Sequence, residues 1–261
     1  MTMELRPLGK TGLRIAPLVF GGNVFGWTAD EARSFELLDA FVDAGFNAID
    51  TADVYSRWVP GHAGGESESI IGRWLDGKST RRAKVLLFTK VGSDMGGDRK
   101  GLGRRWIEQA VEDSLRRLRT EVIDLYQSHR PDPATPHEET LEAYRRLIAA
   151  GKVRAIGCSN FDARQVGDAL RVARAGGLPE YQVLQPEYNL HDRAGFDGPL
   201  RELAIGEGLG VITYFSLASG FLTGKYRSQA DLGKSARGGG MGKYLTPRGR
   251  RILAALDEVA A

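Results

Sequence analysis

Short apolar segments alternate with amphipathic segments along most of the chain, and this alternation limits the possible fold more than any other feature. Alternating strands and helices predict βαβ units and a parallel sheet. The expected strands are residues 17–22, 46–50, 85–90, 124–129, 153–159, 183–187 and 211–214, and the expected helices are residues 30–43, 66–75, 104–118, 136–150, 162–175, 199–207 and 247–260.

Three local patterns add detail to this outline. Glu4 to Pro7 and Leu13 to Ala16 flank a glycine-containing turn and predict a β-hairpin. Thr135-Pro136-His137-Glu138 predicts a helix start, with Thr135 as N-cap, proline at the first helical position and glutamate at N3. Ser228 to Tyr244 is polar and rich in glycine, and we expect a mobile, poorly ordered loop there.

Length and composition exclude several classes of protein. A chain of 261 residues suits one α/β barrel, so we expect residues 1–261 to form a single domain. The net charge is +3, but acids alternate with bases along the helices, as in Glu108 to Glu121, which argues against a nucleic-acid partner. Cys158 is the only cysteine, and the four histidines show no metal spacing, so we expect neither a disulfide nor a metal site.

The start of the chain and its hydropathy predict a location. Met1 to Arg6 does not have the pattern of a signal peptide, and no apolar run has the length of a membrane span. We therefore expect a cytoplasmic protein without a membrane partner. The oligomeric state stays open.

Titratable residues stand at the ends of three successive expected strands. Asp50 ends one strand, with Tyr55 in the loop after it; Lys90 ends the next strand and His129 the third. Parallel strands end at one rim of a barrel, where chemistry takes place. A tyrosine with its ordinary pKa of about 10 is a poor proton donor at neutral pH, and Lys90 could lower that pKa. Each residue alone could be a cap, a solvated charge or a core histidine, but four in order indicate a site.

Neutral polar groups and an aromatic ring follow at the ends of later strands. Ser159 and Asn160 end the fifth expected strand, Gln185 lies near the end of the sixth, and Tyr214 ends the seventh. Such a set suits a flat ring that carries an amide, because polar side chains can hold the carboxamide while the aromatic ring stacks. The alternative is that Ser159 and Asn160 only cap the helix that starts near Asp162.

The stretch from Gly72 to Ser79 matches the P-loop pattern letter by letter, with Gly77-Lys78-Ser79 at its end. A P-loop follows a strand and opens a helix, whereas Gly72 falls inside an expected helix with Gly77 as its C-cap. No Gly-x-Gly-x-x-Gly follows the first strand, so a Rossmann fingerprint is also absent. We therefore do not expect nucleotide hydrolysis.

Several longer motifs together resemble the aldo-keto reductase family, from Leu5 to Tyr226 and so over nearly the whole chain. These motifs are 45–55 (GFNAIDTADVY), 89–90 (TK), 124–129 (DLYQSH), 151–160 (GKVRAIGCSN), 185–189 (QPEYN) and 217–226 (LASGFLTGKY). The resemblance implies a (β/α)8 TIM barrel with an N-terminal β-hairpin plug. It also implies binding of NADPH without a Rossmann motif, and reduction of aldehydes or ketones to alcohols. The motif at His129 and the long loop after Tyr55 resemble the bacterial and potassium-channel β-subunit members.

The family's functional residues carry over to matching positions. The resemblance implies that Tyr55 is the general acid, Lys90 lowers its pKa, Asp50 pairs with Lys90, and His129 orients the carbonyl. It implies that Ser159, Asn160 and Gln185 hold the carboxamide and that Tyr214 stacks on the nicotinamide. Further expected cofactor contacts are Gly22, Asn23, Asp50, Phe215, Ser216, Leu217, Gly220 and Lys225.

One departure from the family concerns the end of the barrel. The family continues past the helix at Pro247 with an eighth strand and a clamp for the adenosine phosphate, whereas we count seven strands before Ala261. An open barrel of seven strands would leave two unpaired edges. We therefore expect a C-terminally incomplete domain that lacks its eighth strand and binds NADPH weakly.

Two functions follow from these expectations. The first is an NADPH-dependent reductase of a small carbonyl compound. The alternative is a nicotinamide-binding regulatory or redox-sensing subunit with little turnover, because such a protein could keep the four titratable residues. An unrelated barrel hydrolase is disfavoured, since the chain shows no catalytic carboxylate pair. Trp27 and Trp58 are expected beside Tyr55 in an apolar substrate pocket.

Overall fold

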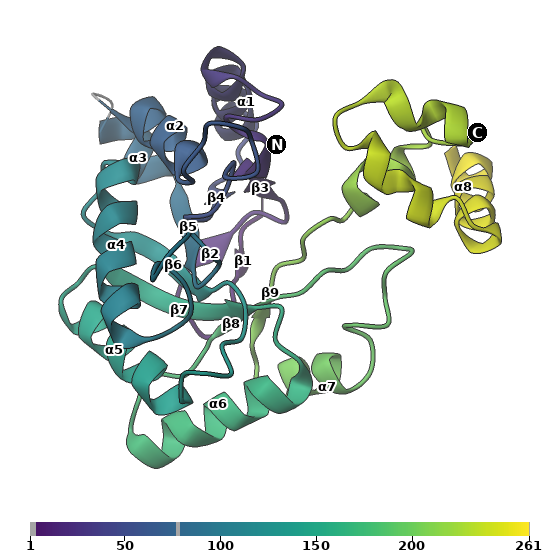
Figure 1. Cartoon of the computed structure of the whole chain (residues 1–261). Helices are drawn as coiled ribbons and strands as arrows, with labels where there is room; N and C mark the ends of the chain where they lie inside the picture. The colour runs from purple at the N-terminus through teal and green to yellow at the C-terminus, as the bar shows by residue number, and fades with distance from the viewer. Residues whose placement is uncertain (1–3, 77–78, 261) are drawn as a thin grey trace. The chain divides into compact units, whose positions relative to one another are not determined.

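The computed structural model describes residues 4–76 and 79–260, and it has an α/β fold (Figure 1). A parallel sheet of seven strands, in the order β3-β4-β5-β6-β7-β8-β9, curls into a half-barrel. Its strands are β3 (Val19–Gly21), β4 (Ala48–Asp50), β5 (Leu86–Val91), β6 (Ile123–Ser128), β7 (Val153–Ser159), β8 (Val183–Gln185) and β9 (Gly210–Val211).

Helices connect the strands in sequence, so each strand pairs with the next one along the chain. The α-helices are α1 (Glu31–Asp43), α2 (Glu66–Leu75), α3 (Ser79–Lys84), α4 (Arg104–Leu118), α5 (His137–Ala149), α6 (Ala163–Gly176), α7 (Pro199–Gly206) and α8 (Pro247–Ala260). Four short 3₁₀ segments are η1 (Gly22–Val24), η2 (Ala218–Thr223), η3 (Gln229–Lys234) and η4 (Gly238–Tyr244). No described helix is long and apolar enough to cross a membrane.

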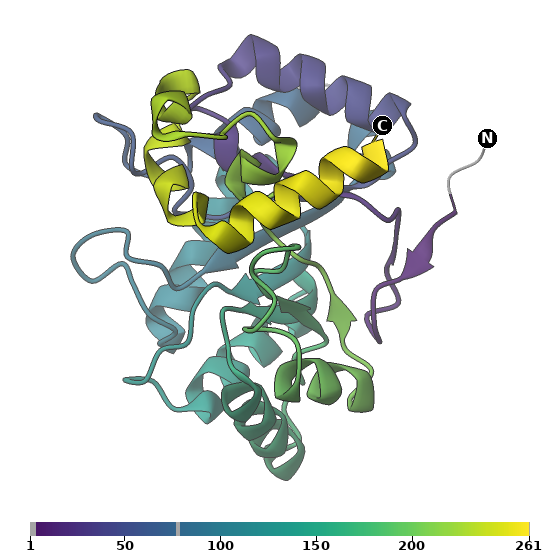
Figure 2. The same ribbon diagram turned by 90° about the vertical axis from the view of Figure 1, so that its right-hand side faces the viewer.

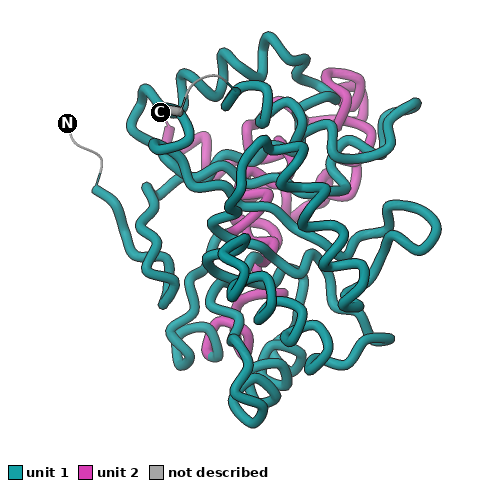
Figure 3. Tube along the Cα trace, turned by 90° about the vertical axis from the view of Figure 1, so that its left-hand side faces the viewer, with its two compact units in different colours: residues 1–185, 203–212 teal, residues 186–202, 213–261 magenta. Residues whose placement is uncertain are grey.

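The chain divides into two compact units, which Figure 3 colours separately. Unit 1 comprises residues 1–185 and 203–212 and holds the whole parallel sheet. Unit 2 comprises residues 186–202 and 213–261 and includes η2, η3, η4 and α8. The expectation of a single domain over residues 1–261 stays a prediction.

The predicted hairpin is confirmed as the antiparallel pair β1 (Arg6–Pro7) and β2 (Arg14–Ile15). Leu8 and Ile15 belong to an apolar cluster with residues of the sheet, among them Ala48, Leu125 and Val183. Gly9 allows this approach, because a Cβ there would lie 2.2 Å from the backbone nitrogen of Gly210. Two related expectations stay predictions: that the hairpin plugs a complete barrel, and that an eighth strand is missing. In the described residues, the outer strands β3 and β9 each pair with one neighbour.

Amphipathic helices were the most accurately predicted elements. The bounds of α2 and α4 match the predicted 66–75 and 104–118, and α4 buries one apolar face that includes Ile107, Val111 and Leu115. The helix α3 has no counterpart among the predictions. Within the P-loop pattern, Gly72 lies inside α2 as expected, whereas Gly77 and Lys78 lie outside the described residues.

Three local predictions are wrong. The last strand is only Gly210–Val211, so Tyr214 does not end it and instead forms an isolated bridge with Glu187. Thr135 is not the N-cap of α5, because its hydroxyl donates to Asp132 and Pro136 takes the cap position without a side-chain cap. Residues 228–244 are not an irregular loop.

Instead, η3 and η4 fold residues 229–234 and 238–244 into two 3₁₀ segments of unit 2 (Figure 2). Met241 and Tyr244 of η4 join an apolar cluster with Phe221, Tyr226 and Leu253 of α8. Burial of these side chains explains why a polar, glycine-rich stretch has regular structure: it contributes few apolar residues, but its larger ones, Leu232, Met241 and Tyr244, pack in this cluster.

Candidate active site

Lys90, near the end of β5, links three groups at the carboxyl end of the sheet. Its ammonium donates to Asp50 Oδ2 at 2.6 Å, to the backbone oxygen of Thr51 at 2.8 Å and to the Tyr55 hydroxyl at 3.1 Å. An ammonium has three N–H bonds, so all of its donor capacity is used. Lys90 has no exposed surface, and a buried cation requires such partners.

Asp50, the last residue of β4, collects hydrogen bonds from three other strands. Its Oδ2 accepts from Lys90 of β5, and its Oδ1 accepts from Gln127 Nε2 of β6 at 3.3 Å and from Gln185 Nε2 of β8 at 3.0 Å. These donors hold the carboxylate in one orientation toward Lys90. Gln185, expected to hold a carboxamide, therefore already uses part of its amide on Asp50.

Burial and Lys90 shift the pKa of Tyr55 in opposite directions. Burial raises the pKa of Tyr55, and the nearby Asp50 carboxylate adds to this, whereas the charge and hydrogen bond of Lys90 lower it. The expected direction of the Lys90 effect is confirmed, but burial outweighs it and the net pKa of Tyr55 is raised. Lys90 nevertheless opposes the larger effect of burial and favours the ionised tyrosine.

His129 follows β6, and its ring meets that of Tyr55 edge-on at 5.9 Å between centroids. Burial lowers its pKa well below the ordinary value, and the charges of Lys90 and Arg130 act in the same direction. The imidazole is therefore neutral at pH 7, with one nitrogen able to donate. Its Nδ1 is buried and has no hydrogen-bond partner among the described residues.

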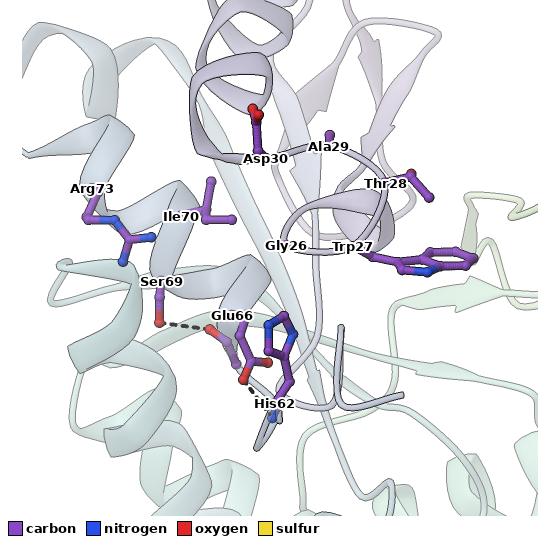
Figure 4. Close-up of a pocket in the computed structure, with 12 residues that line it drawn as sticks. Gly26, Trp27, Thr28, Ala29, Asp30, His62, Glu66, Ser69, Ile70 and Arg73 are labelled. Carbon is purple, nitrogen blue, oxygen red and sulfur yellow. Dashed lines mark hydrogen bonds between the residues drawn. The ribbon is translucent and has the colours of Figure 1, made fainter. Parts of the chain in front are cut away.

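Two tryptophan rings, those of Trp58 and Trp27, lie near Tyr55. The ring of Trp58 lies 6.1 Å from that of Tyr55 and 5.6 Å from that of Trp27. Trp27 also lines a cavity of about 680 Å³ between the turn at residues 26–30 and the first turns of α2 (Figure 4). None of Asp50, Tyr55, Lys90 and His129 lines this cavity, so it is separate from the group around Lys90.

The expected cofactor residues of unit 1 lie at the ends of β3, β4, β7 and β8. Ser159 Oγ donates to the backbone oxygen of Gln185 at 2.7 Å, and Asn160 Nδ2 donates to the backbone oxygen of His129 at 2.8 Å. Asn160 has a left-handed backbone, with φ of 64°. The alternative role of Ser159 and Asn160 as helix caps is wrong, because Asp162 caps α6 through a capping box with Gln165.

Gly22 and Asn23 form the turn η1 immediately after β3. The backbone oxygen of Gly22 accepts from Ser67 Oγ at 2.7 Å, and Ser67 in turn meets the Thr51 hydroxyl at 2.8 Å. A Cβ on Gly22 would lie 3.2 Å from the backbone oxygen of Asp50. The turn is therefore packed directly against the end of β4, and Ser67 and Thr51 are two supporting residues that sequence analysis did not identify.

The expected cofactor residues of unit 2 lie in one segment with an unusual backbone. Phe215, Ala218, Ser219 and Gly220 all have positive φ, between 48° and 104°. Such conformations are uncommon outside glycine and occur often in ligand-binding segments. The remaining expected residues here are Tyr214, Ser216, Leu217 and Lys225.

This segment also carries positive charge. The guanidinium of Arg237 lies 5.9 Å from the centre of the Phe215 ring, and a Cβ on Gly220 would lie 3.6 Å from the Lys225 ammonium. Arg237 was missed by sequence analysis, because it falls in the stretch expected to be a loop. A cation near a strained backbone turn suits an anionic group such as a phosphate.

The arrangement in unit 1 suits proton transfer. A tyrosine hydroxyl, a buried ammonium and a neutral imidazole converge, and the described residues hold no group of three His, Cys, Asp or Glu side chains that could bind a metal ion. A hydroxyl held 3.1 Å from an ammonium can release its proton to a substrate oxygen as charge develops there.

Comparison with known proteins gives consistent matches. The model of the aldo/keto reductase family matches residues 17–261. The aldo-keto reductase YhdN of Bacillus subtilis is 34% identical over 264 residues, covering 98% of this chain and 75% of that protein. The oxidoreductase YrpG of the same organism is 38% identical over 229 residues, or 85% of this chain and 69% of that protein. A probable voltage-gated potassium channel β subunit of Oryza sativa is 38% identical over 226 residues, or 86% and 67%.

Proposed function

Because the chain belongs to the aldo/keto reductase family, we propose that it is an NADPH-dependent oxidoreductase that reduces small aldehydes or ketones to alcohols in the cytoplasm. The observation that carries the proposal is the contact of Tyr55 with Lys90, which is itself paired with Asp50. A half-buried tyrosine with a cation on its hydroxyl is equipped to donate a proton and to take it back in the reverse direction.

In the proposed reaction each residue of this group has a separate task. NADPH, when bound, supplies the hydride. Tyr55 donates its hydroxyl proton to the carbonyl oxygen, and the ammonium of Lys90 stabilises the tyrosinate that remains. Asp50 keeps Lys90 in place and charged. His129, as a neutral imidazole, donates a hydrogen bond that orients the carbonyl oxygen toward Tyr55.

For the cofactor we propose two groups of residues, each described within its own unit. In unit 1 these residues are Gly22, Asn23, Asp50, Ser159, Asn160 and Gln185, whose polar groups suit a carboxamide. In unit 2 they are Tyr214, Phe215, Ser216, Leu217, Gly220 and Lys225. The left-handed backbone at Phe215 and Gly220 and the cations Lys225 and Arg237 support the second group, because a dinucleotide carries several phosphate charges.

A second candidate function is a nicotinamide-binding regulatory subunit with little turnover. The similarity to a probable potassium channel β subunit favours it. The two functions differ in one measurable property, since a reductase oxidises NADPH repeatedly when a carbonyl compound is present. The direct test is to follow NADPH absorbance with a panel of aromatic, aliphatic and keto-acid carbonyl compounds.

Replacing Tyr55 by phenylalanine tests its role. We expect kcat for carbonyl reduction to fall by at least about 10²-fold, the usual scale of general acid catalysis, and the affinity for NADPH to stay unchanged. Tyr181→Phe is a matched control, because it removes another buried tyrosine hydroxyl, bonded to Ser128, without removing the proposed acid. Near-normal turnover by the Tyr55 variant would refute the assignment.

A further inference from the structure

Asp53 lies between Asp50 and Tyr55 in the turn that follows β4, and its environment is unlike that of the other buried acids. It is 1% exposed, and its backbone N–H donates to the backbone oxygen of Lys90 at 3.3 Å. Both side-chain oxygens are buried, and neither has a hydrogen-bond partner among the described residues. Ionised carboxylates inside proteins are normally paired or hydrogen-bonded.

The two nearest cations are already engaged by other groups. All three N–H bonds of Lys90 point to Asp50, Thr51 and Tyr55. Arg117 of α4 donates from Nε to Glu68 Oε2 of α2 at 2.6 Å. The other carboxylate oxygen of Glu68 accepts from Thr89 at 2.6 Å, so Glu68 is fully satisfied.

The buried charges near Asp53 form two ion pairs and cancel without it. Asp50 pairs with Lys90, and Glu68 pairs with Arg117. An ionised Asp53 would add a third negative charge with no cation of its own. Buried charge that is not paired is strongly disfavoured, so the neutral acid is the form that fits this position.

Charged and titratable groups from several elements lie around Asp53, and Tyr144 of α5 is one of them. Burial raises the pKa of Asp53 well above its ordinary value and the charge of Glu68 adds to this, whereas Arg117, the backbone N–H of Val54 and Lys90 lower it by less. The Tyr126 hydroxyl of β6 is also close, is buried and lacks a partner. On its own turn, Asp53 acts on Tyr55, because a negative charge at Asp53 raises the pKa of that tyrosine.

We propose that Asp53 is a positioning residue that the site holds as a neutral, unpaired carboxylic acid, and that its charge, once it ionises, keeps the proton on Tyr55. This proposal rests on the function proposed above, in which carbonyl reduction requires the protonated tyrosine. Loss of the Asp53 proton to solvent then extends the pH range over which Tyr55 can act as an acid.

The pH dependence of activity tests the proposal in Asp53→Asn, which has the same shape and no charge. Without the anion, Tyr55 loses its proton more readily at alkaline pH. We expect the alkaline fall of kcat/KM for carbonyl reduction, and the matching rise for alcohol oxidation, to move to lower pH than in the wild type. A merely structural loss would lower activity at all pH values without moving the inflection, and an unmoved inflection would overturn the proposal.

The pH dependence of stability is a readout independent of turnover. An unfolded aspartate ionises near pH 4, whereas native Asp53 stays protonated, so the unfolded state binds fewer protons above that pH. The folding equilibrium constant of the wild type should therefore fall relative to that of D53N by about tenfold per pH unit, until Asp53 itself ionises. A constant ratio from pH 5 to pH 8 would show that native Asp53 is ionised.

Asp124→Asn serves as the control, because Asp124 is equally buried but pairs with Arg82 and Arg154. We expect that variant to lose stability without a shift of the alkaline inflection. Infrared spectra of wild-type protein with carbon-13-labelled aspartate report on Asp53 even if D53N does not fold. A carboxylic acid band at pH 7 that disappears at alkaline pH supports the proposal, and its absence contradicts it. These two readouts do not need turnover, so failure of the proposed reductase function is recognised separately.

Discussion

Replacing Gly72 by alanine gives a quantitative test of how α2 and α4 pack. A Cβ at Gly72 would lie 2.0 Å from the backbone oxygen of Arg117, whereas ordinary contact begins at 3.4 Å. The obstacle is backbone, so the two helices must separate. Overpacking of this kind costs about 1–3 kcal/mol or more. Alanine recovers about 1 kcal/mol through its higher helix propensity. A contact this short lies at the upper end of the overpacking range, so we expect a net loss of stability of about 2 kcal/mol.

The matched control is Gly167→Ala in α6, where an added Cβ meets no atom within 4 Å. The same substitution should there stabilise the protein by about 0.5–1 kcal/mol. Urea unfolding followed by circular dichroism measures both variants, and unchanged m-values would show that the unfolded states are comparable. If G72A were as stable as the wild type, the helices would not be in the tight contact described, and the reasoning would be refuted.

Two further predictions concern the proposed acid and its neighbours. Lys90→Met removes the cation that favours tyrosinate, so kcat for reduction should fall on the order of 10²-fold and the pH profile of alcohol oxidation should move upward. Asp50→Asn acts through Lys90, whose charge the carboxylate favours, and should move that profile in the same direction by less; an unmoved profile in Lys90→Met would contradict the assignment. The pKa of His129 is held low, so activity should not fall through its protonation between pH 8 and pH 6. His129→Gln, which keeps a neutral donor, should retain more activity than His129→Leu in steady-state assays.

Much of the sheet and of the candidate site follows from local patterns. The apolar spacing along residues 104–118 determines one helix face, and the predicted bounds match α4. Asp50, Lys90 and His129 could be brought together in advance because parallel strands that follow one another end at the same edge. The family motifs then indicated the chemistry expected at that edge.

Other features depend on contacts between residues far apart in the sequence, which local sequence patterns do not predict. The contacts of Gln127 and Gln185 with Asp50 depend on how β4, β6 and β8 are placed relative to one another. The net direction of the Tyr55 pKa depends on how deeply the hydroxyl is buried, and the isolation of Asp53 depends on where the bonds of Lys90 and Arg117 go. Residues 228–244 have regular structure because of a few apolar contacts within unit 2, which their composition does not suggest.

The hydrogen bonds of Asp50 have a consequence for the order of folding. Its bond to Lys90 spans 40 residues, whereas its bond to Gln185 spans 135. Contacts between distant residues require large loops to close and slow the folding of a chain. During synthesis, Asp50 and Lys90 can meet long before β8 exists, but the carboxylate obtains its full set of donors only when that strand docks. Recovery of activity during refolding should therefore lag behind formation of β4 and β5.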